Sequence, residues 1–214
     1  IKSTKGINLP HANVGELGLA FDRRFVVSDN SGQFITARTE PSLCLVTTML
    51  TAKGLTLAAP NMPTLVFSYQ EFSDQYQNVN VWDDEIAGQR CSTEINSWFS
   101  EYLQRPCQLL YFGEKSSRIK KENTVDARKI AFADGYPLLL ISQASLDDLN
   151  QRLSANNQKT VSMAHFRPNI VVENCLPFAE DGWQYIRIGN VEFKVSKPCE
   201  RCIFTTVNPV DGII

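Results

Sequence analysis

The stretch KPCERCIFTT, residues 197–206, places two cysteines, Cys199 and Cys202, three positions apart. Thiolates at this spacing can bind zinc or exchange with a disulfide. A single thiolate can also bind a metal that carries its other ligands within an organic cofactor. These chemistries need different surroundings, so the rest of the sequence can be used to compare them.

A structural zinc site needs four protein ligands, usually supplied as two paired groups. The chain has a single Cys-x-x-Cys motif and two histidines, His11 and His165, neither at ligand spacing from a cysteine. The sequence therefore argues against a closed zinc site.

Disulfide exchange gains from a helix that begins directly after the first cysteine. Here the following residues, CIFTTV, are β-branched and aromatic and predict a strand. In an extended chain, residues three apart point to opposite faces, so Cys199 and Cys202 would not share a ligand. We therefore expect one functional cysteine with a supporting neighbour, which suits a single thiolate ligand to a soft or high-valent metal.

Organic cofactors of this kind often carry phosphate, which needs basic side chains and backbone N–H groups. Basic candidates near expected strand ends are Lys2, Lys5, Arg23 and Arg167. Each of them, taken alone, also fits an ordinary surface charge.

Composition narrows the class of protein. The 214 residues are 43% hydrophobic and 21% charged, as in ordinary globular proteins. The net charge of −2 argues against binding to nucleic acid as a polymer, and no apolar run approaches the ~20 residues of a membrane span. Six cysteines are too few for a disulfide scaffold and favour a reducing, cytoplasmic compartment.

The first hundred residues predict mainly strands. Hairpins are expected in FVVSDNSGQFITA, around residues 29–32, and in LVTTMLTAKGLTLAAP, around residues 53–54. Such short strands suggest a barrel or sandwich. A helix is expected in STEINSWFSEYLQRP, with Ser92 or Thr93 as its cap and Pro106 at its end.

Residues 113–129 are polar, with six basic and three acidic side chains. They predict either a solvated linker near a domain boundary or a mobile basic flap over an anionic ligand. After them, FADGYPLLLIS predicts a buried strand, SQASLDDLNQRLSAN a helix capped by Ser142 or Ser145, and FRPNIVVE an extended segment. WQYIRIGNVEFKV predicts a hairpin that turns at residues 189–190.

The order of several motifs resembles a known family. These motifs are IKSTKG, FDRRF, ITARTEP, FADGYPLLLIS, FRPNIVV and PCERCIFTTV, and they cover essentially the whole chain. They resemble the molybdenum-cofactor sulfurase C-terminal (MOSC) family. The resemblance is closest to the subgroup with an N-terminal β-barrel domain, namely YcbX-type proteins and the mitochondrial amidoxime-reducing component.

The resemblance implies a molybdenum cofactor, held as a pyranopterin dithiolene, with Cys202 as the cysteine ligand of the metal. The residues that it implies for binding the cofactor and its phosphate are Lys2, Ser3, Arg23, Arg167, Asn169 and Arg201. Asp134 falls where the family places residues close to the metal and substrate. A proton relay or a hydrogen bond to substrate is implied there, and a plain role as the turn residue before Gly135 stays open.

The fold class implied is α+β and β-rich, with an N-terminal β-barrel-like domain over residues 1–115 and a MOSC β-barrel domain over residues 116–214. The second barrel, with peripheral helices, is expected to be incomplete at its C-terminal end, because the resemblance implies a MOSC domain that continues past VDGII. The start at Ile1 and the end in VDGII also predict a piece of a longer protein. A [2Fe–2S] cluster would belong to a C-terminal domain outside this sequence.

The activity implied is reduction of N-hydroxylated compounds (hydroxylamines, amidoximes, N-hydroxylated bases) to amines, with a role in detoxification. The electron donor would be a ferredoxin-like domain or a flavoprotein reductase. Two alternatives stay open at this point. One is a sulfur carrier that uses a cysteine persulfide, and the other is a module that binds the cofactor without catalysis.

Overall fold

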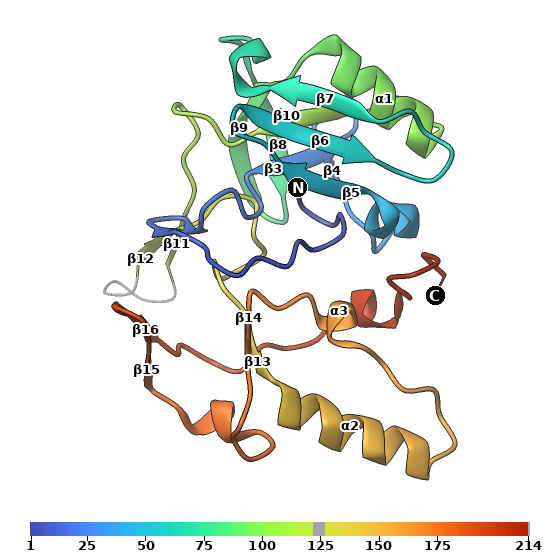
Figure 1. Ribbon diagram of the computed structural model, residues 1–214. Coiled ribbons are helices and arrows are strands. Elements are labelled where there is room, and N and C mark those ends of the chain that lie inside the picture. Colours follow the sequence, from blue (N-terminus) through green and yellow to red (C-terminus); the bar gives the residue numbers. More distant parts are fainter. Residues whose placement is uncertain (122–126, 214) are drawn as a thin grey trace. The chain divides into compact units, whose positions relative to one another are not determined.

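The computed structural model describes residues 1–121 and 127–213 (Figure 1). These residues divide into two compact units. The first unit holds the described residues up to Pro137 and those from Val207 onward, and the second holds Leu138–Thr206. The boundary expected near residue 115 stays a prediction. No helix in the described part of the chain is long and apolar enough to cross a bilayer.

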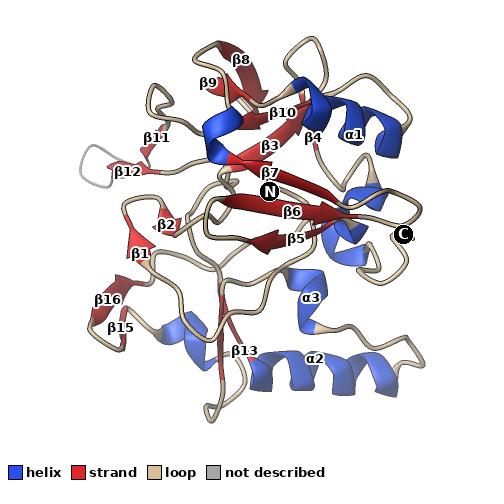
Figure 2. Ribbon diagram, turned by 45° about the horizontal axis from the view of Figure 1, so that its top comes forward, coloured by secondary structure: helices blue, strands red, loops and turns tan. Residues whose placement is uncertain are grey.

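The first unit is built mostly from strands (Figure 2). Its strands are β1 Val14–Gly15, β2 Gly18–Leu19, β3 Phe25–Ser28, β4 Phe34–Ile35, β5 Thr47–Leu50, β6 Gly54–Ala58, β7 Leu65–Ser68, β8 Tyr76–Val81, β9 Asp84–Arg90, β10 Gln108–Tyr111, β11 Ile119–Lys121 and β12 Ala127–Lys129. Its helices are α1 Thr93–Leu103 and two short 3-10 helices, Pro41–Leu45 and Tyr69–Glu71.

Two antiparallel sheets make the barrel-like body of this unit. One has the strand order β4-β3-β10-β9-β8 and the other the order β5-β6-β7. Both expected hairpins are confirmed, because β3 pairs with β4 and β5 pairs with β6. The prediction of a β-rich fold with a barrel-like N-terminal part is therefore confirmed.

Strand β3, with the sequence FVVS, is buried at all four positions, since both of its faces are covered. On one face Phe25 meets Phe67 of β7, with ring centroids 6.2 Å apart, so the two sheets share an aromatic layer. On the other face Val26 packs in a buried cluster that includes Phe132. Residues 130–133 therefore belong to the core of the first unit.

Helix α1 forms where it was predicted. The side chain of Ser92 accepts a hydrogen bond from the Ile95 N–H, and Gln104 ends the helix in the left-handed conformation. Ile95, Trp98 and Phe99 are buried on one face of the helix, which packs against β10 and β7. Their helical spacing is the pattern from which the helix was predicted.

The second unit contains fewer strands. Its elements are β13 Leu140–Ser142, α2 Gln143–Ala155, α3 Met163–Phe166, β14 Ile170–Val172, the 3-10 helix Ala179–Gly182, β15 Tyr185–Ile188, β16 Val191–Lys194 and the 3-10 helix η4 Ile203–Thr206. Strands β13 and β14 pair in parallel, and β15 and β16 form the predicted hairpin. The predicted helix α2 is confirmed, with the Ser142 side chain accepting from the Ser145 N–H at 3.0 Å.

The structure corrects two interpretations of the middle of the chain. Residues 119–121 and 127–129 pair as the β11–β12 hairpin, and Arg118 is buried, so a solvated linker is wrong there. The expected flap also includes residues 122–126, which lie outside the described residues, and it stays a prediction. The buried strand expected in residues 132–142 is limited to β13, because residues 130–133 are buried without forming a strand.

The cysteine stretch is not a strand. Residues 195–202 have no regular secondary structure, and Ile203–Thr206 forms the 3-10 helix η4. The expectation that Cys199 and Cys202 lie on opposite faces of one strand is therefore wrong. The β-branched run predicted a strand because local propensity is a weak guide where tertiary contacts decide the backbone.

Candidate functional site

In the first unit, Asp134 is the centre of a charged group. Its Oδ1 accepts from the Lys2 ammonium at 2.5 Å and from the Trp82 indole N–H at 2.9 Å. Its Oδ2 accepts from the Arg38 guanidinium at 2.9 Å. Three donors from segments far apart in the sequence thus meet on one carboxylate.

Each donor is held by its own local structure. Lys2 is buried, its backbone N–H donates to the Phe25 carbonyl of β3, and its ammonium also donates to the Phe132 carbonyl at 2.7 Å. Trp82 lies between β8 and β9 with a φ of 58°, and the Arg38 guanidinium stacks on its ring at 4.8 Å. The group is therefore anchored by several segments, including β3 and the β8–β9 turn, rather than by one loop.

Burial and charge oppose each other in this group. Burial lowers the pKa of Lys2, the nearby Asp134 carboxylate raises it in part, and the net result is a pKa of about 8. Burial alone would raise the pKa of Asp134, but the Lys2 charge and the hydrogen bonds from Lys2 and Trp82 outweigh it. They hold the pKa of Asp134 well below its usual range. Asp134 is therefore an ionised carboxylate at neutral pH.

Ser3 and Arg23 also lie in the first unit. Ser3 follows Lys2 in the sequence, and the charge of Arg23 acts on Lys2. Both have a left-handed backbone, with φ values of 72° and 47°. Arg23 forms an ion pair with Asp22, and its backbone carbonyl accepts from the Phe132 N–H at 3.1 Å. Its positive charge acts on Lys2 and lowers the pKa of that residue.

The second unit holds the cysteine pair. Cys199 and Cys202 are both exposed and neither is in a disulfide. The Arg201 guanidinium donates to Cys199 Sγ at 3.3 Å and to the Phe166 carbonyl at 2.8 Å, and it lies over the Phe166 ring. Arg201 therefore ties the cysteine loop to the end of α3 through the Phe166 carbonyl and also contacts Cys199 within the loop, while Cys202 is exposed.

Arg167 and Asn169 follow α3 directly. Arg167 ends this helix in the left-handed conformation, with a φ of 56°, and its guanidinium lies 5.2 Å from the centre of the Phe204 ring. Asn169 pairs with Leu139, which donates its N–H to Asn169 Oδ1 and accepts from the Asn169 N–H. Leu139 stands directly before β13, so this pairing leads into the parallel β13–β14 contact.

The predicted site residues thus form two groups, each described within its own unit. Lys2, Ser3, Arg23 and Asp134 lie in the first unit, and Arg167, Asn169, Arg201 and Cys202 lie in the second. Direct contact joins Lys2 and Asp134. The predicted roles of all eight residues stay predictions.

Sequence analysis missed two members of the Asp134 group. Arg38 stands in the motif ITARTEP, whose single basic residue could have been singled out. Trp82 follows the alternating run VNV and precedes two acidic residues, which is a hairpin signal that was passed over. Their meeting at Asp134 leaves no signal in the sequence, because 52 and 96 residues separate them from it.

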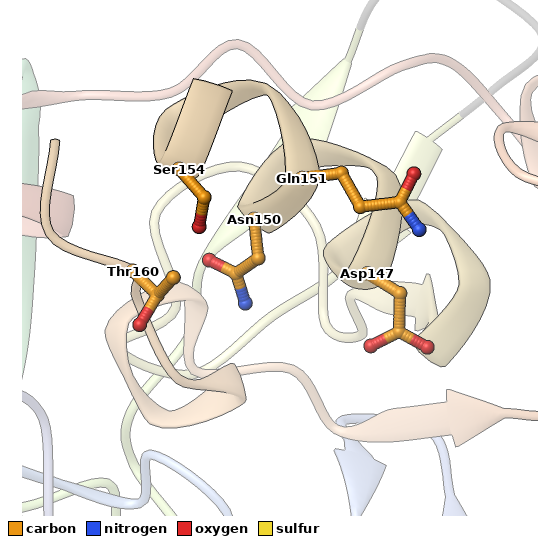
Figure 3. A pocket seen from close by; sticks show the side chains of 5 residues that line it. All are labelled: Asp147, Asn150, Gln151, Ser154 and Thr160. Atoms are coloured by element: carbon orange, nitrogen blue, oxygen red, sulfur yellow. The ribbon is translucent and has the colours of Figure 1, made fainter. Parts of the chain in front are cut away.

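An open depression on α2 lies apart from these residues within the second unit. It is lined by Asp147, Asn150, Gln151, Ser154 and Thr160 (Figure 3). The Asn150 side chain is already used there, since it donates to the Val161 carbonyl and accepts from the Val161 N–H. We assign no function to this depression.

Within the residues that the structure describes, no three His, Cys, Asp or Glu side chains gather as a metal site made by protein ligands alone would require. Within the second unit, the exposed Cys202 is a single thiolate that can serve as one ligand. A single thiolate suits a metal that brings most of its own ligands.

Comparisons with known proteins agree with this arrangement. The MOSC N-terminal beta barrel domain matches residues 1–106, and the MOSC domain matches residues 127–211. The whole chain is 39% identical to mitochondrial amidoxime reducing component 2 of Rattus norvegicus and 36% identical to that of Homo sapiens, covering 66% of each. It is 32% identical to mitochondrial amidoxime-reducing component 1 of Danio rerio, of which it covers 67%.

The resemblance seen in the motif order is thereby confirmed, and the chain spans about two thirds of the length of these relatives. The barrel-like first unit contains the region that matches the N-terminal barrel domain and extends beyond it. The chain belongs to the MOSC-domain family that includes the mitochondrial amidoxime reducing components.

Proposed function

We propose that this chain is part of a molybdenum-dependent oxidoreductase that reduces N-hydroxylated compounds, such as hydroxylamines, amidoximes and N-hydroxylated bases, to amines. The observation that carries the proposal is the family membership along the whole chain. The relatives are named as amidoxime reducing components, and we extend that activity to this chain. The exposed Cys202 supports the extension.

The residues present fit a molybdenum cofactor. A metal held by the dithiolene sulfurs of its own cofactor needs one protein thiolate, and Cys202 is exposed and outside any disulfide. The cofactor's phosphate needs cations, for which Lys2, Arg23 and Arg167 are the proposed partners. Left-handed backbone at Ser3, Arg23 and Arg167 is the kind of strain that gathers at ligand sites. When bound, the cofactor would supply the two-electron redox chemistry.

The charged group around Asp134 limits the roles of its members. A group that moves protons at neutral pH needs a pKa near the working pH. Asp134 does not meet this condition, because its pKa lies well below the usual range, whereas the pKa of Lys2 is about 8. We therefore assign Asp134 the role of a fixed anion that orients Lys2 and Arg38, and Lys2 the role of the group that can hold or release a proton.

The first test is elemental analysis for molybdenum and zinc on the full-length protein, purified from cells that make molybdenum cofactor. We expect near-stoichiometric molybdenum in the wild type and background levels in Cys202→Ser. Cys199→Ser is the matched control, and it should retain molybdenum because Cys199 is engaged by Arg201. An aryl amidoxime with an artificial electron donor should be reduced by the wild type and not by Cys202→Ser.

Two other functions predict different results in the same experiment. A sulfur carrier would lack molybdenum and show a labile extra sulfur on Cys199 or Cys202 by mass spectrometry. A binding module without catalysis would retain molybdenum yet reduce no N-hydroxylated substrate with a competent donor. Full reductase activity in Cys202→Ser would contradict the ligand assignment itself.

The remaining parts of the proposal concern partners and location. The electron donor is proposed to be a ferredoxin-like domain, with its [2Fe–2S] cluster, or a flavoprotein reductase. The cytoplasmic location and the role in detoxification also stay predictions, and the relatives are named as mitochondrial proteins.

A further inference from the structure

The segment of residues 130–134, IAFAD, is buried over its first four residues without being part of a strand. Buried backbone carbonyls need hydrogen-bond donors, which a sheet would normally supply. Here the donors are side chains. The Arg118 guanidinium donates to the carbonyls of Ala131 at 3.0 Å, Ala133 at 2.5 Å and Asp134 at 3.3 Å. The Lys2 ammonium donates to the carbonyl of Phe132.

Two cations serve all four carbonyls from residue 131 to residue 134. Arg118 donates to those of residues 131, 133 and 134, and Lys2 donates to that of residue 132. The N–H groups of Ile130 and Phe132 donate to the backbone carbonyls of Arg118 and Arg23. The carbonyls of this segment are thus bound by two buried charged side chains rather than by a neighbouring strand.

Arg118 is itself oriented by the β8–β9 hairpin, in which Asp84 is the first residue of β9. Its Nε donates to Asp84 Oδ2 at 2.7 Å, and the exposed fraction of its side chain is 1%. Trp82, two residues before Asp84, donates to the Asp134 carboxylate. The same hairpin therefore holds the backbone of the segment through Asp84 and Arg118, and the carboxylate at its end through Trp82.

This arrangement uses properties that only arginine has. A guanidinium presents five N–H donors in a rigid plane, so one side chain can reach a carboxylate and several carbonyls at once. A lysine ammonium keeps the charge but loses the planar fork, so it cannot reproduce these contacts together. The buried cation is matched by the ionised Asp84, whose pKa is lowered by hydrogen bonds from Lys120 and Arg118 despite the opposing effect of burial.

We propose that Arg118 is a positioning residue for Asp134: with Asp84 it fixes the backbone of residues 131–134 so that the Asp134 carboxylate meets Lys2, Arg38 and Trp82. Arg118 comes from the polar stretch whose composition suggested a linker or flap. Its importance for catalysis rests on the proposed function, whereas its effect on Asp134 does not.

The test is NMR of the protein without cofactor, so that it does not depend on activity. The readouts are the carboxyl carbon resonance of Asp134 as a function of pH and the indole N–H resonance of Trp82 at neutral pH. In the wild type we expect the Asp134 carboxyl to titrate well below the ordinary aspartate pKa of about 4. In Arg118→Lys and Arg118→Gln we expect the pKa of Asp134 to rise toward that ordinary value, and the Trp82 resonance to move.

Leu57→Ala is the matched control, because Leu57 is fully buried in β6 and takes no part in these contacts. It should destabilise the first unit while leaving the Asp134 titration and the Trp82 resonance unchanged. If both Arg118 variants keep the wild-type titration and the wild-type Trp82 resonance, the positioning role is refuted. The same holds if Leu57→Ala changes both readouts as much as Arg118→Lys does.

Activity then adds a second readout. If Arg118 acts through Asp134, the double variant Arg118→Lys/Asp134→Asn should have the same kcat/KM as Asp134→Asn alone. Additive losses would overturn the inference. If the Arg118 variants change the Asp134 titration and the Trp82 resonance as expected, but the wild-type protein has no reductase activity, the positioning role is supported and the proposed function is contradicted.

Discussion

Replacing Asp134 by asparagine tests how the charged group is balanced. The change keeps the size of the side chain and an oxygen that can accept from Lys2 and Trp82, but it removes the negative charge. It also turns an N–H₂ group toward one of the cations that the carboxylate now faces. The buried Lys2 ammonium then loses the carboxylate with which it is paired.

The cost can be bounded from burial. Removing one partner of a fully buried ion pair costs about 3–5 kcal/mol, whereas an exposed pair contributes about 0–1 kcal/mol. The side chain of Lys2 is 6% exposed and that of Asp134 is 50% exposed, so the pair lies between these cases. We therefore expect Asp134→Asn to lower the free energy of unfolding by about 2 kcal/mol near neutral pH.

Most of that loss should depend on pH. The folded-state pKa of Lys2, about 8, lies below its value of 10.5 in an unfolded chain. The unfolded chain therefore binds more protons between these values, and the free energy of unfolding rises with pH across that window. Since Asp134 raises the pKa of Lys2, asparagine should lower it further and start this rise at a lower pH.

Each unit by which the Lys2 pKa falls changes the gap between wild type and variant by about 1.4 kcal/mol. For a fall of about one unit, the gap of about 2 kcal/mol at pH 6 should shrink to about 0.6 kcal/mol at pH 10, where Lys2 is neutral in both proteins.

Urea unfolding followed by tryptophan fluorescence at about pH 6 and about pH 10 measures the gap directly. Glu40→Gln is the matched control, because Glu40 pairs with the more exposed Arg105 in the same unit. It should cost less than about 1 kcal/mol at neutral pH. An equal gap for Asp134→Asn at both pH values, or no gap at either, would refute the assignment of Lys2 as a buried charge sustained by Asp134.

Arg167→Ala should lower the molybdenum and phosphate that remain after purification, and Arg187→Ala, which alters an exposed ion pair in the same unit, should not; unchanged content would contradict the proposed phosphate contact. Ser142→Ala should cost about 1–2 kcal/mol, because this cap is buried and bonded to Ser145 at 3.0 Å. Ser92→Ala should cost about 0.5–1 kcal/mol, since its cap bond is 3.5 Å long, and thermal unfolding compares the two.

The elements that were predicted correctly are those with strong local signals. Helix α1 follows from the spacing of Ile95, Trp98 and Phe99, and the β15–β16 hairpin from strict alternation on either side of Gly189. The prediction of a strand in the cysteine stretch was wrong because β-propensity was the only signal behind it. The observed backbone of this stretch is set by contacts such as that of Arg201 with Phe166, which is 35 residues away.

The sequence alone determined the β-rich class, the family and the identity of the candidate residues, because motif order and periodicity are local properties of the chain. Only the tertiary structure decided that Asp134 is an ionised carboxylate and that Arg118 is buried. The reason is physical. The charge state and burial of a side chain depend on partners that folding brings together, and Lys2 and Asp134 are 132 positions apart in the sequence.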